Sequence, residues 1–385
     1  MRSETVSLGE ACTVVMGQSP PGTSYNTSGD GLPFFQGKAD FGEIYPKVRV
    51  FCNQPSRIAE EGDILMSVRA PVGPTNLAKE KCCIGRGLAA LRTDAKLCTS
   101  FLLYFLRHHE PRLASQGQGS TFDAINRDDL EEIEIPLPAL PEQQRIAGRL
   151  EQADRQVQTR RYALELTDTF LPATFLELFG NPVANPRGWE RARICELGDV
   201  ETGNTPPRET ADYYGSAIEW IKSDNISLAQ MHPSNATEGL SEKGIEVGRI
   251  VETGSLLLTC IAGSETSIGN VVLTDRRVAF NQQIKALTPH QDVDPQFLYG
   301  LFLAAKPMIQ RNTTLAMKRM ITKGKLEQLV LVKPPLPLQQ KFAALVERVE
   351  GLRAVQREAL RQAEHLFASL LARAFGADSS SEPGN

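Results

Sequence analysis

The sequence lacks the marks of a metalloprotein, a membrane protein or a secreted protein. Its seven cysteines form no Cys-x-x-Cys pair, and its five histidines fall at no spacing that suits a metal ion. No apolar run approaches the roughly 18 residues that a membrane span needs. The first residues have no apolar core of a signal peptide. We therefore expect no metal site and no membrane contact, buried reduced thiols, and a cytoplasmic location.

The sequence also lacks an excess of positive charge. Lys and Arg number 42 against 46 Asp and Glu, and the formal net charge is −4. A chain that held nucleic acid by phosphate neutralisation alone would carry a strongly basic surface. If this chain binds DNA, its basic residues must be gathered on one face, or a partner must supply part of the positive charge.

Motifs for chemistry on nucleic acids are missing as well. The chain has neither the Gly-rich loop and Asn/Asp-Pro-Pro-aromatic motif of an adenine methyltransferase nor the Gly-x-x-x-x-Gly-Lys-Ser/Thr motif of an ATP-driven motor. The nearest approach to a nuclease Asp-x-Lys motif is Asp94-Ala95-Lys96, which has no partner acids at a convincing spacing and is interpreted as a solvated turn. We predict that the chain has no catalytic residue and binds no cofactor.

What the sequence does contain is an internal repeat. A shift of 196 residues, from position 130 to position 326, aligns the last half of one copy with the last half of the other without a gap. It matches Leu130-Glu131 with Leu326-Glu327, Leu140-Pro141 with Leu336-Pro337, Gln143-Gln144 with Gln339-Gln340, and Phe179-Gly180 with Phe375-Gly376. Upstream the copies diverge, although Gly17-Gln18-Ser19-Pro20-Pro21 resembles Gly203-Asn204-Thr205-Pro206-Pro207. A divergent first part and a matched last part favour one scaffold that carries two different specificities.

Each matched part predicts a proline-rich strap followed by a long helix. Proline fixes φ and removes a hydrogen-bond donor, so a helix can begin directly after Ile135–Pro141 or Val332–Pro337. Apolar residues then recur at steps of three, four or seven, which is a heptad seam. The seam positions are Ile146, Leu150, Ala153, Val157, Leu164, Leu171 and Leu178 in the first copy, and Phe342, Val346, Val349, Leu360, Ala363, Phe367, Leu370 and Ala374 in the second.

The divergent parts predict a mixed α/β (α+β) fold, because short apolar runs of strand length are bounded by Gly, Pro, Asp or Asn. The whole is then two tandem recognition domains joined by two long helices that pack as an antiparallel coiled coil with pseudo-twofold symmetry. The expected boundaries are 1–138 for the first domain, 139–180 for the central helical region, 184–335 for the second domain, 336–376 for the C-terminal helical region, and 377–385 for a disordered tail. About 38 helical residues would span roughly 57 Å, or about 17 base pairs, so the helices are expected to set a spacing.

These features resemble the specificity subunit of Type I restriction-modification systems. The resemblance rests on the turn Gly119-Ser120-Thr121 before Ile125, the strap and helix start at Leu140-Pro141-Glu142-Gln143-Gln144, and a long helix that closes with Phe-Gly, each within a doubled architecture. The second copy departs from this pattern at Leu338, which replaces the Glu, and at Ala316-Met317, which replace Ser-Thr.

The resemblance implies a non-catalytic chain that reads a bipartite site in double-stranded DNA through two target recognition domains. Two modification subunits would carry S-adenosylmethionine and methylate adenine, and two restriction subunits would carry the nuclease and an ATP-driven motor that uses Mg²⁺. Two alternatives remain open: the specificity subunit of a related bipartite cutter whose partner fuses nuclease and methylase, and a coiled-coil scaffold that never touches DNA.

Candidate DNA-contacting residues are polar side chains in the divergent parts. Arg and Lys suit guanine, Asn and Gln suit adenine, and Ser and Thr suit phosphates. The candidates are Gln18, Ser19, Arg69, Arg86, Gln116, Gln118, Ser120 and Thr121 in the first copy, and Asn204, Thr205, Arg208, Lys222, Asn281, Gln282, Lys318 and Arg319 in the second.

Overall fold

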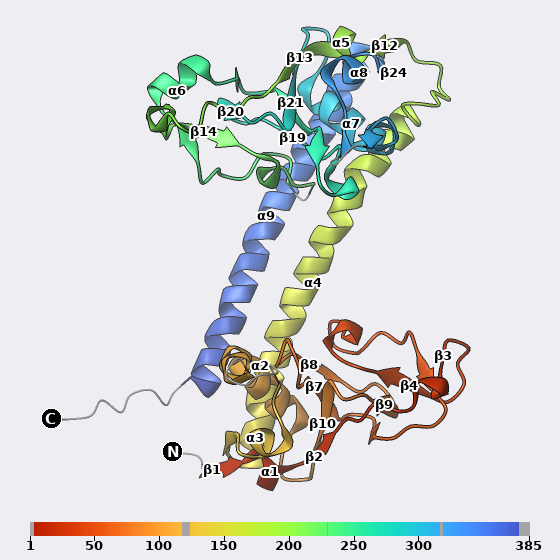
Figure 1. The fold of residues 1–385 in the computed structure, drawn as a ribbon, viewed down its shortest axis with the longest axis vertical. Coiled ribbons are helices and arrows are strands. Elements are labelled where there is room, and N and C mark those ends of the chain that lie inside the picture. Colours follow the sequence, from red (N-terminus) through yellow and green to blue (C-terminus); the bar gives the residue numbers. More distant parts are fainter. Residues whose placement is uncertain (1–3, 118–123, 229, 316–318, 377–385) are drawn as a thin grey trace, which may run out of the picture. The chain divides into compact units, whose positions relative to one another are not determined.

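The computed structural model describes residues 4–117, 124–228, 230–315 and 319–376 (Figure 1). The side chains of Gln116 and Leu315 are not among the described parts. The candidates Gln118, Ser120, Thr121 and Lys318, and the predicted tail 377–385, also lie outside the described residues. The chain forms two compact units: unit 1 comprises Met1–Thr159 with Leu360–Asn385, and unit 2 comprises Arg160–Ala359.

Unit 1 is built on two sheets. The first is antiparallel, in the order β2-β10-β7-β8 (Cys12–Met16, Leu88–Thr93, Ile64–Ser67, Thr75–Leu77). The second has the order β3-β5-β4-β9-β6 (Tyr25–Asn26, Phe51–Cys52, Leu32–Phe35, Cys82–Ile84, Ile58–Ala59), and its β4–β9 pair is parallel. A further pair joins β1 (Glu4–Ser7) to β11 (Glu134–Leu137), which overlaps the first part of the proline strap. The helices are α1 (Leu8–Ala11), η1 (Gly22–Ser24), η2 (Lys38–Asp40), α2 (Thr99–Gly117) and α3 (Arg127–Glu131).

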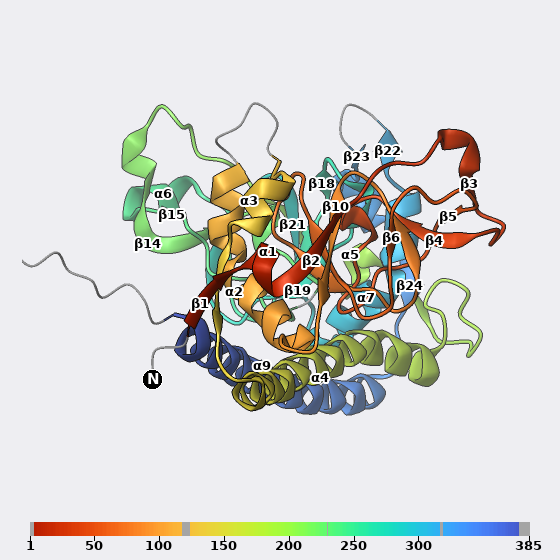
Figure 2. The ribbon, with the colours of Figure 1, turned by 90° about the horizontal axis from the view of Figure 1, so that it is seen from below.

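The central strands of unit 1 bury both faces, which explains their continuous apolar runs. Successive side chains of a strand point to opposite faces, so Ile64 and Met66 lie in the core shared with Phe101 of α2, whereas Leu65 lies in the core shared with Phe35 of the second sheet. Helix α2 therefore packs between the first sheet and the long helix α4 (Figure 2).

Unit 2 repeats this plan. Its antiparallel sheet has the order β13-β21-β17-β19 (Gly198–Thr202, Ile284–Pro289, Leu256–Thr259, Val271–Leu273). Its second sheet has the order β15-β14-β20-β16 (Gly239–Leu240, Tyr214–Ile221, Val278–Phe280, Ile250–Val251), with β14 and β20 parallel. Smaller sheets are β12-β24 (Arg191–Arg193, Val330–Val332) and β18-β23-β22 (Ile261–Ala262, Arg319–Met320, Thr314–Leu315). The helices are α5 (Ile194–Leu197), η3 (Ala211–Tyr213), η4 (Ser223–Asn225), α6 (Glu242–Val247), η5 (Glu265–Ser267), α7 (Pro295–Arg311) and α8 (Lys323–Glu327).

The two long helices predicted from the heptad seam are present as α4 (Leu140–Phe179) and α9 (Leu336–Phe375), each of 40 residues. Each contributes residues to both units. Within unit 2 they run antiparallel, because Asp168 pairs with Arg353 while Phe175, further along α4, packs on Phe342 near the start of α9. Across the part of the chain that the structure describes, no helix is long and apolar enough to cross a membrane.

The end of the first seam differs from the prediction. Leu178 is 41% exposed, whereas Phe175 and Phe179 are buried against Phe342. The reason is a third helix: Phe297 of α7 contacts both phenylalanine rings, so the buried face of α4 turns toward them and away from Leu178. A seam drawn for two helices alone does not include that contact.

A buried glutamine at the start of each long helix ties the helix to its unit. In unit 1 the side-chain oxygen of Gln143 accepts the Cys98 N–H at 2.8 Å, and its nitrogen donates to the carbonyls of Lys96 and Pro138 at 2.9 and 2.8 Å. In unit 2 Gln339 accepts the Asp294 N–H and donates to the carbonyls of Asp292 and Pro334. The repeated Gln-Gln pair of the sequence thus has a structural cause at its first member.

The cysteine prediction is confirmed at five positions and wrong at two. Cys12, Cys52, Cys82, Cys83 and Cys260 are buried free thiols, whereas Cys98 and Cys195 are only partly buried. Burial raises the pKa of the Cys12 and Cys260 thiols to about 12, so both stay protonated at neutral pH.

Candidate nucleic-acid interface

A glycine-containing loop and a tight turn approach each other closely in unit 1. The loop begins at Gly17, whose N–H donates to the carbonyl of Leu88 at 2.8 Å, and the N–H of Gln18 donates to Ile84 at 3.1 Å. A Cβ added at Gly17 would lie 2.2 Å from the carbonyl oxygen of Gly85, so only glycine permits this approach. The loop is thereby held against the turn between β9 and β10.

Unit 2 contains the same arrangement. The N–H of Gly203 donates to Ile284 at 3.1 Å, and the N–H of Asn204 donates to Phe280 at 3.2 Å. A Cβ at Gly203 would lie 2.1 Å from the carbonyl oxygen of Asn281. We call this loop and turn together the cradle; its backbone is alike in the two units although the local sequences differ.

A tyrosine holds the proline segment of each cradle. The hydroxyl of Tyr25 donates to the carbonyl of Pro20 at 2.8 Å, and the hydroxyl of Tyr214 donates to Pro206 at 2.6 Å. The match of the two Pro-Pro segments in the sequence therefore corresponds to a shared loop conformation.

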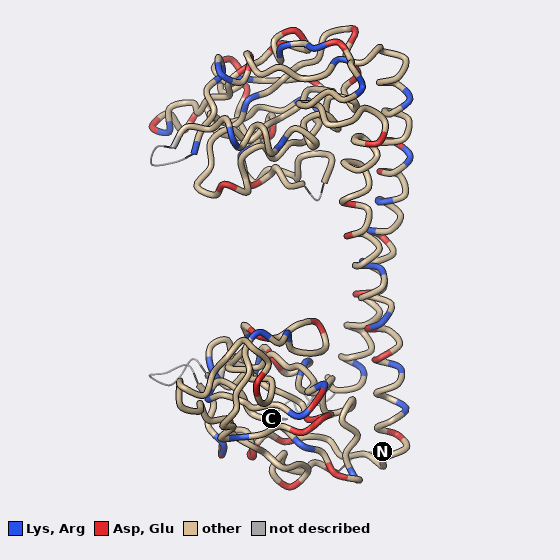
Figure 3. The backbone as a smooth tube through the Cα atoms, turned by 90° about the vertical axis from the view of Figure 1, so that its right-hand side faces the viewer, with Lys and Arg blue, Asp and Glu red and all other residues tan. Residues whose placement is uncertain are grey.

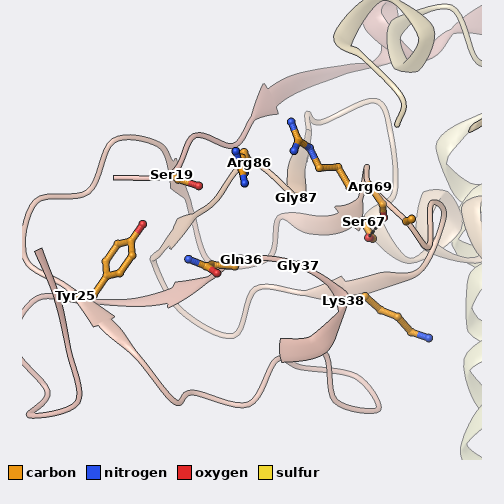
Figure 4. A pocket seen from close by; sticks show the side chains of 10 residues that line it. Ser19, Tyr25, Gln36, Gly37, Lys38, Ser67, Arg69, Arg86 and Gly87 are labelled. Atoms are coloured by element: carbon orange, nitrogen blue, oxygen red, sulfur yellow. Dashed lines mark hydrogen bonds between the residues drawn. The ribbon is translucent and has the colours of Figure 1, made fainter. Parts of the chain in front are cut away.

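A hollow of about 400 Å³ lies beside the cradle of unit 1 (Figure 4). In this view Tyr25 and Lys38 lie at opposite ends, with Arg69 and Arg86 between them. The lining residues are Ser19, Tyr25, Gln36, Gly37, Lys38, Ser67, Arg69, Ala70, Arg86 and Gly87. Three candidates from the sequence, Ser19, Arg69 and Arg86, are thus brought together, and all three are exposed. Among the residues that the structure describes, no carboxylate pairs with either arginine.

Backbone hydrogen bonds identify the equivalent positions in unit 2. The N–H of Gly85 donates to Phe35, and the N–H of Asn281 donates to Ile221. The next residue of each turn is Arg86 in unit 1 and Gln282 in unit 2; both are exposed. Gln282 accepts a hydrogen bond from the Thr205 hydroxyl, whose loop position corresponds to that of Ser19. Thr205 and Gln282 are therefore also brought together.

The side chains of two candidates of unit 2 form hydrogen bonds with other residues of the same unit. The side-chain oxygen of Asn204 accepts the N–H of Arg249 at 2.8 Å, and its nitrogen donates to the carbonyl of Val247 at 2.7 Å. Asn281 is 6% exposed, and its side chain bonds to Gln283. Both side chains therefore stabilise the cradle through these hydrogen bonds. Contact of either side chain with a DNA base stays a prediction.

The three basic candidates of unit 2 that the structure describes pair with carboxylates. Arg208 and Lys222 both pair with Glu238, and Arg319 pairs with Glu265 at 2.9 Å. Outside the hollow, Gln18 is exposed and Gln116 belongs to α2.

Sequence reasoning did not select Gln36, Lys38, Tyr25 and Ser67, which line the hollow, or Glu238. The match between the two Pro-Pro segments was a signal that pointed to this region, because it fixes which residues start the loop. The other members reach the hollow from strands distant in the sequence, so no local pattern identifies them.

Lys and Arg are mixed with Asp and Glu over each unit and along both long helices (Figure 3). In this view neither unit shows a face made of Lys and Arg alone. Asp94-Ala95-Lys96 is an exposed turn before α2, as predicted. Within the described ranges, no group of three or more His, Cys, Asp or Glu side chains could hold a metal ion.

Two related α/β units, each with a cradle beside its antiparallel sheet, define a two-domain protein with a repeated architecture. The family model described as Type I restriction modification DNA specificity domain matches residues 2–165 and 186–364. The chain belongs to this family and carries two copies of its domain, which confirms the resemblance inferred from the repeat.

Relatives agree with this assignment. A putative Type I restriction enzyme MjaX specificity subunit of Methanocaldococcus jannaschii is 47% identical over 161 residues, which cover 41% of this chain and 38% of that protein. The MjaIX specificity subunit of the same organism is 23% identical over 316 residues, 76% of this chain and 71% of that protein. These relatives are specificity subunits, in keeping with the prediction that the chain is non-catalytic.

Solved structures share the fold over nearly the whole chain. The S subunit of a Type I restriction-modification system from M. genitalium has a TM-score of 0.61 at 16% identity, covering 97% of this chain and 96% of that one. A chain from a study of Type I R-M assembly and conformational transition has a TM-score of 0.59 at 19% identity, with 97% of each chain covered. The predicted mixed α/β fold with two recognition domains and two long helices is confirmed.

Proposed function

We propose that the chain reads a bipartite sequence in double-stranded DNA, with one part read by each unit. The observation that carries this proposal is the cradle: its backbone is repeated, while its exposed side chains differ in chemistry between the units. Arg86 suits two acceptors on guanine, whereas Gln282 suits the acceptor and donor on adenine. Recognition of a two-part DNA sequence requires one scaffold with two DNA-contacting surfaces of different chemistry.

In this proposal partner subunits perform the chemistry. Two modification subunits hold S-adenosylmethionine and methylate adenine, and two restriction subunits hold ATP and Mg²⁺ and cleave the DNA; this chain binds none of these cofactors. The complex acts on DNA in the cytoplasm. Because this chain has a net charge of −4, partner subunits also supply part of the positive charge that binds DNA phosphates.

An apolar stripe on α4 supports a helical docking surface for the modification subunit. Tyr162, Leu166 and Phe170 recur at steps of four and are 61%, 54% and 50% exposed. Residues spaced in this way lie on one helix face. Their exposure on the described surface of unit 2 would be relieved by a partner helix.

Motif mapping of methylated adenines tests the proposal. A strain that expresses this chain with its modification subunit should carry one split methylated motif, and deletion of either gene should abolish it. The absence of any motif that depends on this gene would reject the proposal and favour a scaffold that never touches DNA. A motif that requires a partner in which nuclease and methylase are fused would identify the alternative bipartite cutter.

A further inference from the structure

Unit 2 contains a trio of charged side chains, and the equivalent positions among the described residues of unit 1 hold uncharged residues. The carboxylate of Glu238 bridges two basic side chains: one oxygen lies 2.9 Å from Nη1 of Arg208, and the other accepts a hydrogen bond from Nζ of Lys222. All three side chains remain partly exposed, so the trio faces solvent rather than the core. We call these three residues the charged trio.

Two aromatic rings support the basic members of the trio. The guanidinium carbon of Arg208 lies 4.6 Å from the ring centroid of Tyr214 and 5.0 Å from that of Trp220. Nζ of Lys222 lies 5.2 Å from the Trp220 ring. Cations at these distances from ring faces are attracted electrostatically, so the two positive groups are held in place as well as neutralised.

The acidic member is positioned by the sheet. The N–H of Trp220 donates to the carbonyl of Glu238 at 3.0 Å. In unit 1 the N–H of Phe34 donates to the carbonyl of Val50 at 2.9 Å. Val50 therefore occupies in unit 1 the place that Glu238 occupies in unit 2.

The basic members have uncharged counterparts too. Lys222 follows the strand residue Ile221, and Gln36 follows the equivalent Phe35. Arg208 follows the Pro-Pro segment of its loop, where unit 1 has Gly22. The three equivalent positions therefore hold Gly, Gln and Val in unit 1 and Arg, Lys and Glu in unit 2.

The charged trio lies beside the cradle of unit 2, which we propose contacts DNA bases. Gln36 lines the hollow of unit 1, so Lys222 stands at the equivalent edge in unit 2. Two cations at this edge suit a DNA phosphate, and a carboxylate between them competes with that phosphate. Hydrogen bonding from Lys222, aided by Arg208, lowers the pKa of Glu238, so the competing negative charge persists at neutral pH.

We propose that Glu238 is a specificity-determining residue, which restrains Arg208 and Lys222 from binding the backbone of DNA of any sequence. The inference rests on the proposed function. Base contacts fix the register of unit 2 on its motif, where Arg208 and Lys222 stay on the carboxylate. On unrelated DNA no register is fixed, so cations released from the carboxylate would take any phosphate and add affinity that does not depend on sequence.

The test uses the complex of the full chain with its modification subunit and the variant Glu238→Gln. Its dissociation constants are measured against salt, for a duplex with the methylated motif and for an unrelated duplex. Removing the competitor should tighten binding to unrelated DNA by roughly three- to tenfold and steepen its salt dependence by about one unit of slope. The preference for the motif should fall by a similar factor.

Glu252→Gln is the matched control. Glu252 also lies in unit 2 and pairs with an arginine, Arg277, at 3.1 Å, and the substitution makes the same change in net charge. This control should leave the ratio between the two duplexes near that of the wild type. Adding Arg208→Gln to the Glu238→Gln chain should remove part of the extra binding to unrelated DNA.

The outcomes separate the inference from the function on which it rests. If the wild-type complex shows no preference for the motif, the proposed function fails. If the wild type shows the preference and Glu238→Gln retains it in full, or Glu252→Gln reduces it equally, the restraint is wrong. Loss of motif binding by a Glu238→Gln complex with unchanged thermal unfolding would also overturn it, because Glu238 would then be needed for contact.

Discussion

Arg86 lines the unit 1 hollow, and no carboxylate within the described residues pairs with it, whereas its counterpart Gln282 accepts a hydrogen bond from a loop threonine. The two turns have equivalent backbone hydrogen bonds, so the side chain is what differs between them at this position. We predict that Arg86→Gln weakens binding to the first half-site by about 1–3 kcal/mol and relaxes or changes the base preferred at one position. Methylation motif mapping, together with binding to duplexes substituted at each position, measures both effects.

Arg145→Gln provides the comparison. Arg145 is an exposed arginine of α4 that pairs with Glu142 on its own helix and does not line the hollow. Its substitution should leave the motif unchanged. An Arg86→Gln complex with wild-type affinity and an unaltered motif would show that this position does not read a base.

At the scale of elements, the attachment of each long helix depends on one buried glutamine. Gln143→Ala removes an acceptor and a donor that serve three backbone groups. We predict a loss of roughly 2–3 kcal/mol in the free energy of unfolding of unit 1, since buried polar groups would be left without partners. Urea unfolding measures the loss. The neighbouring Gln144 is exposed, and Gln144→Ala should change stability little; equal effects of the two substitutions would contradict the assigned role.

The strand β14 is tied to distant loops by an ion pair whose strength depends on pH. Arg276 donates hydrogen bonds to Glu219 and lowers the pKa of that carboxyl, which also accepts the N–H of Ala236. A carboxyl with a depressed pKa contributes stability above its unfolded pKa, about 4.3, and loses it as pH falls through the lower folded value. We predict that Glu219→Gln lowers the melting temperature of unit 2 more at pH 7 than at pH 3. Equal losses at both pH values would show that charge is not the cause.

At the scale of the whole molecule, the two units are expected to be separable in specificity. Replacing residues 1–138 with the equivalent segment of another family member should change the first half of the methylated motif and leave the second half intact. Motif mapping of the chimera is the measurement. A change in both halves of the motif would show that each unit contributes to recognition of both halves.

The helices allow a complementary experiment. Since α4 and α9 each contribute to both units, inserting the same number of helical turns into both should alter the number of unread base pairs while each half-motif is kept. Mapping the motif before and after insertion checks this. An unchanged spacing would contradict the expected role of the helices in setting it.

The sequence by itself determined the repeat, the straps and the two long helices. These features depend on local chemistry: proline excludes regular hydrogen bonding, and apolar residues at helical spacing need a buried face. The family followed from the same residues because its architecture is doubled. The end of the first seam was not determined in this way. Phe297 of α7 packs against Phe175 and Phe179, so these two residues are buried and Leu178 is exposed.

Only the tertiary structure decided which polar residues are available for reading. Asn204 and Asn281 share the chemistry of a base-reading amide, yet both bond within their own unit. Glu238 pairs with Arg208, which lies 30 positions earlier in the sequence (208 against 238), because the fold brings the two segments together. A side chain's freedom depends on partners that the fold brings from distant segments, and no local pattern carries that information.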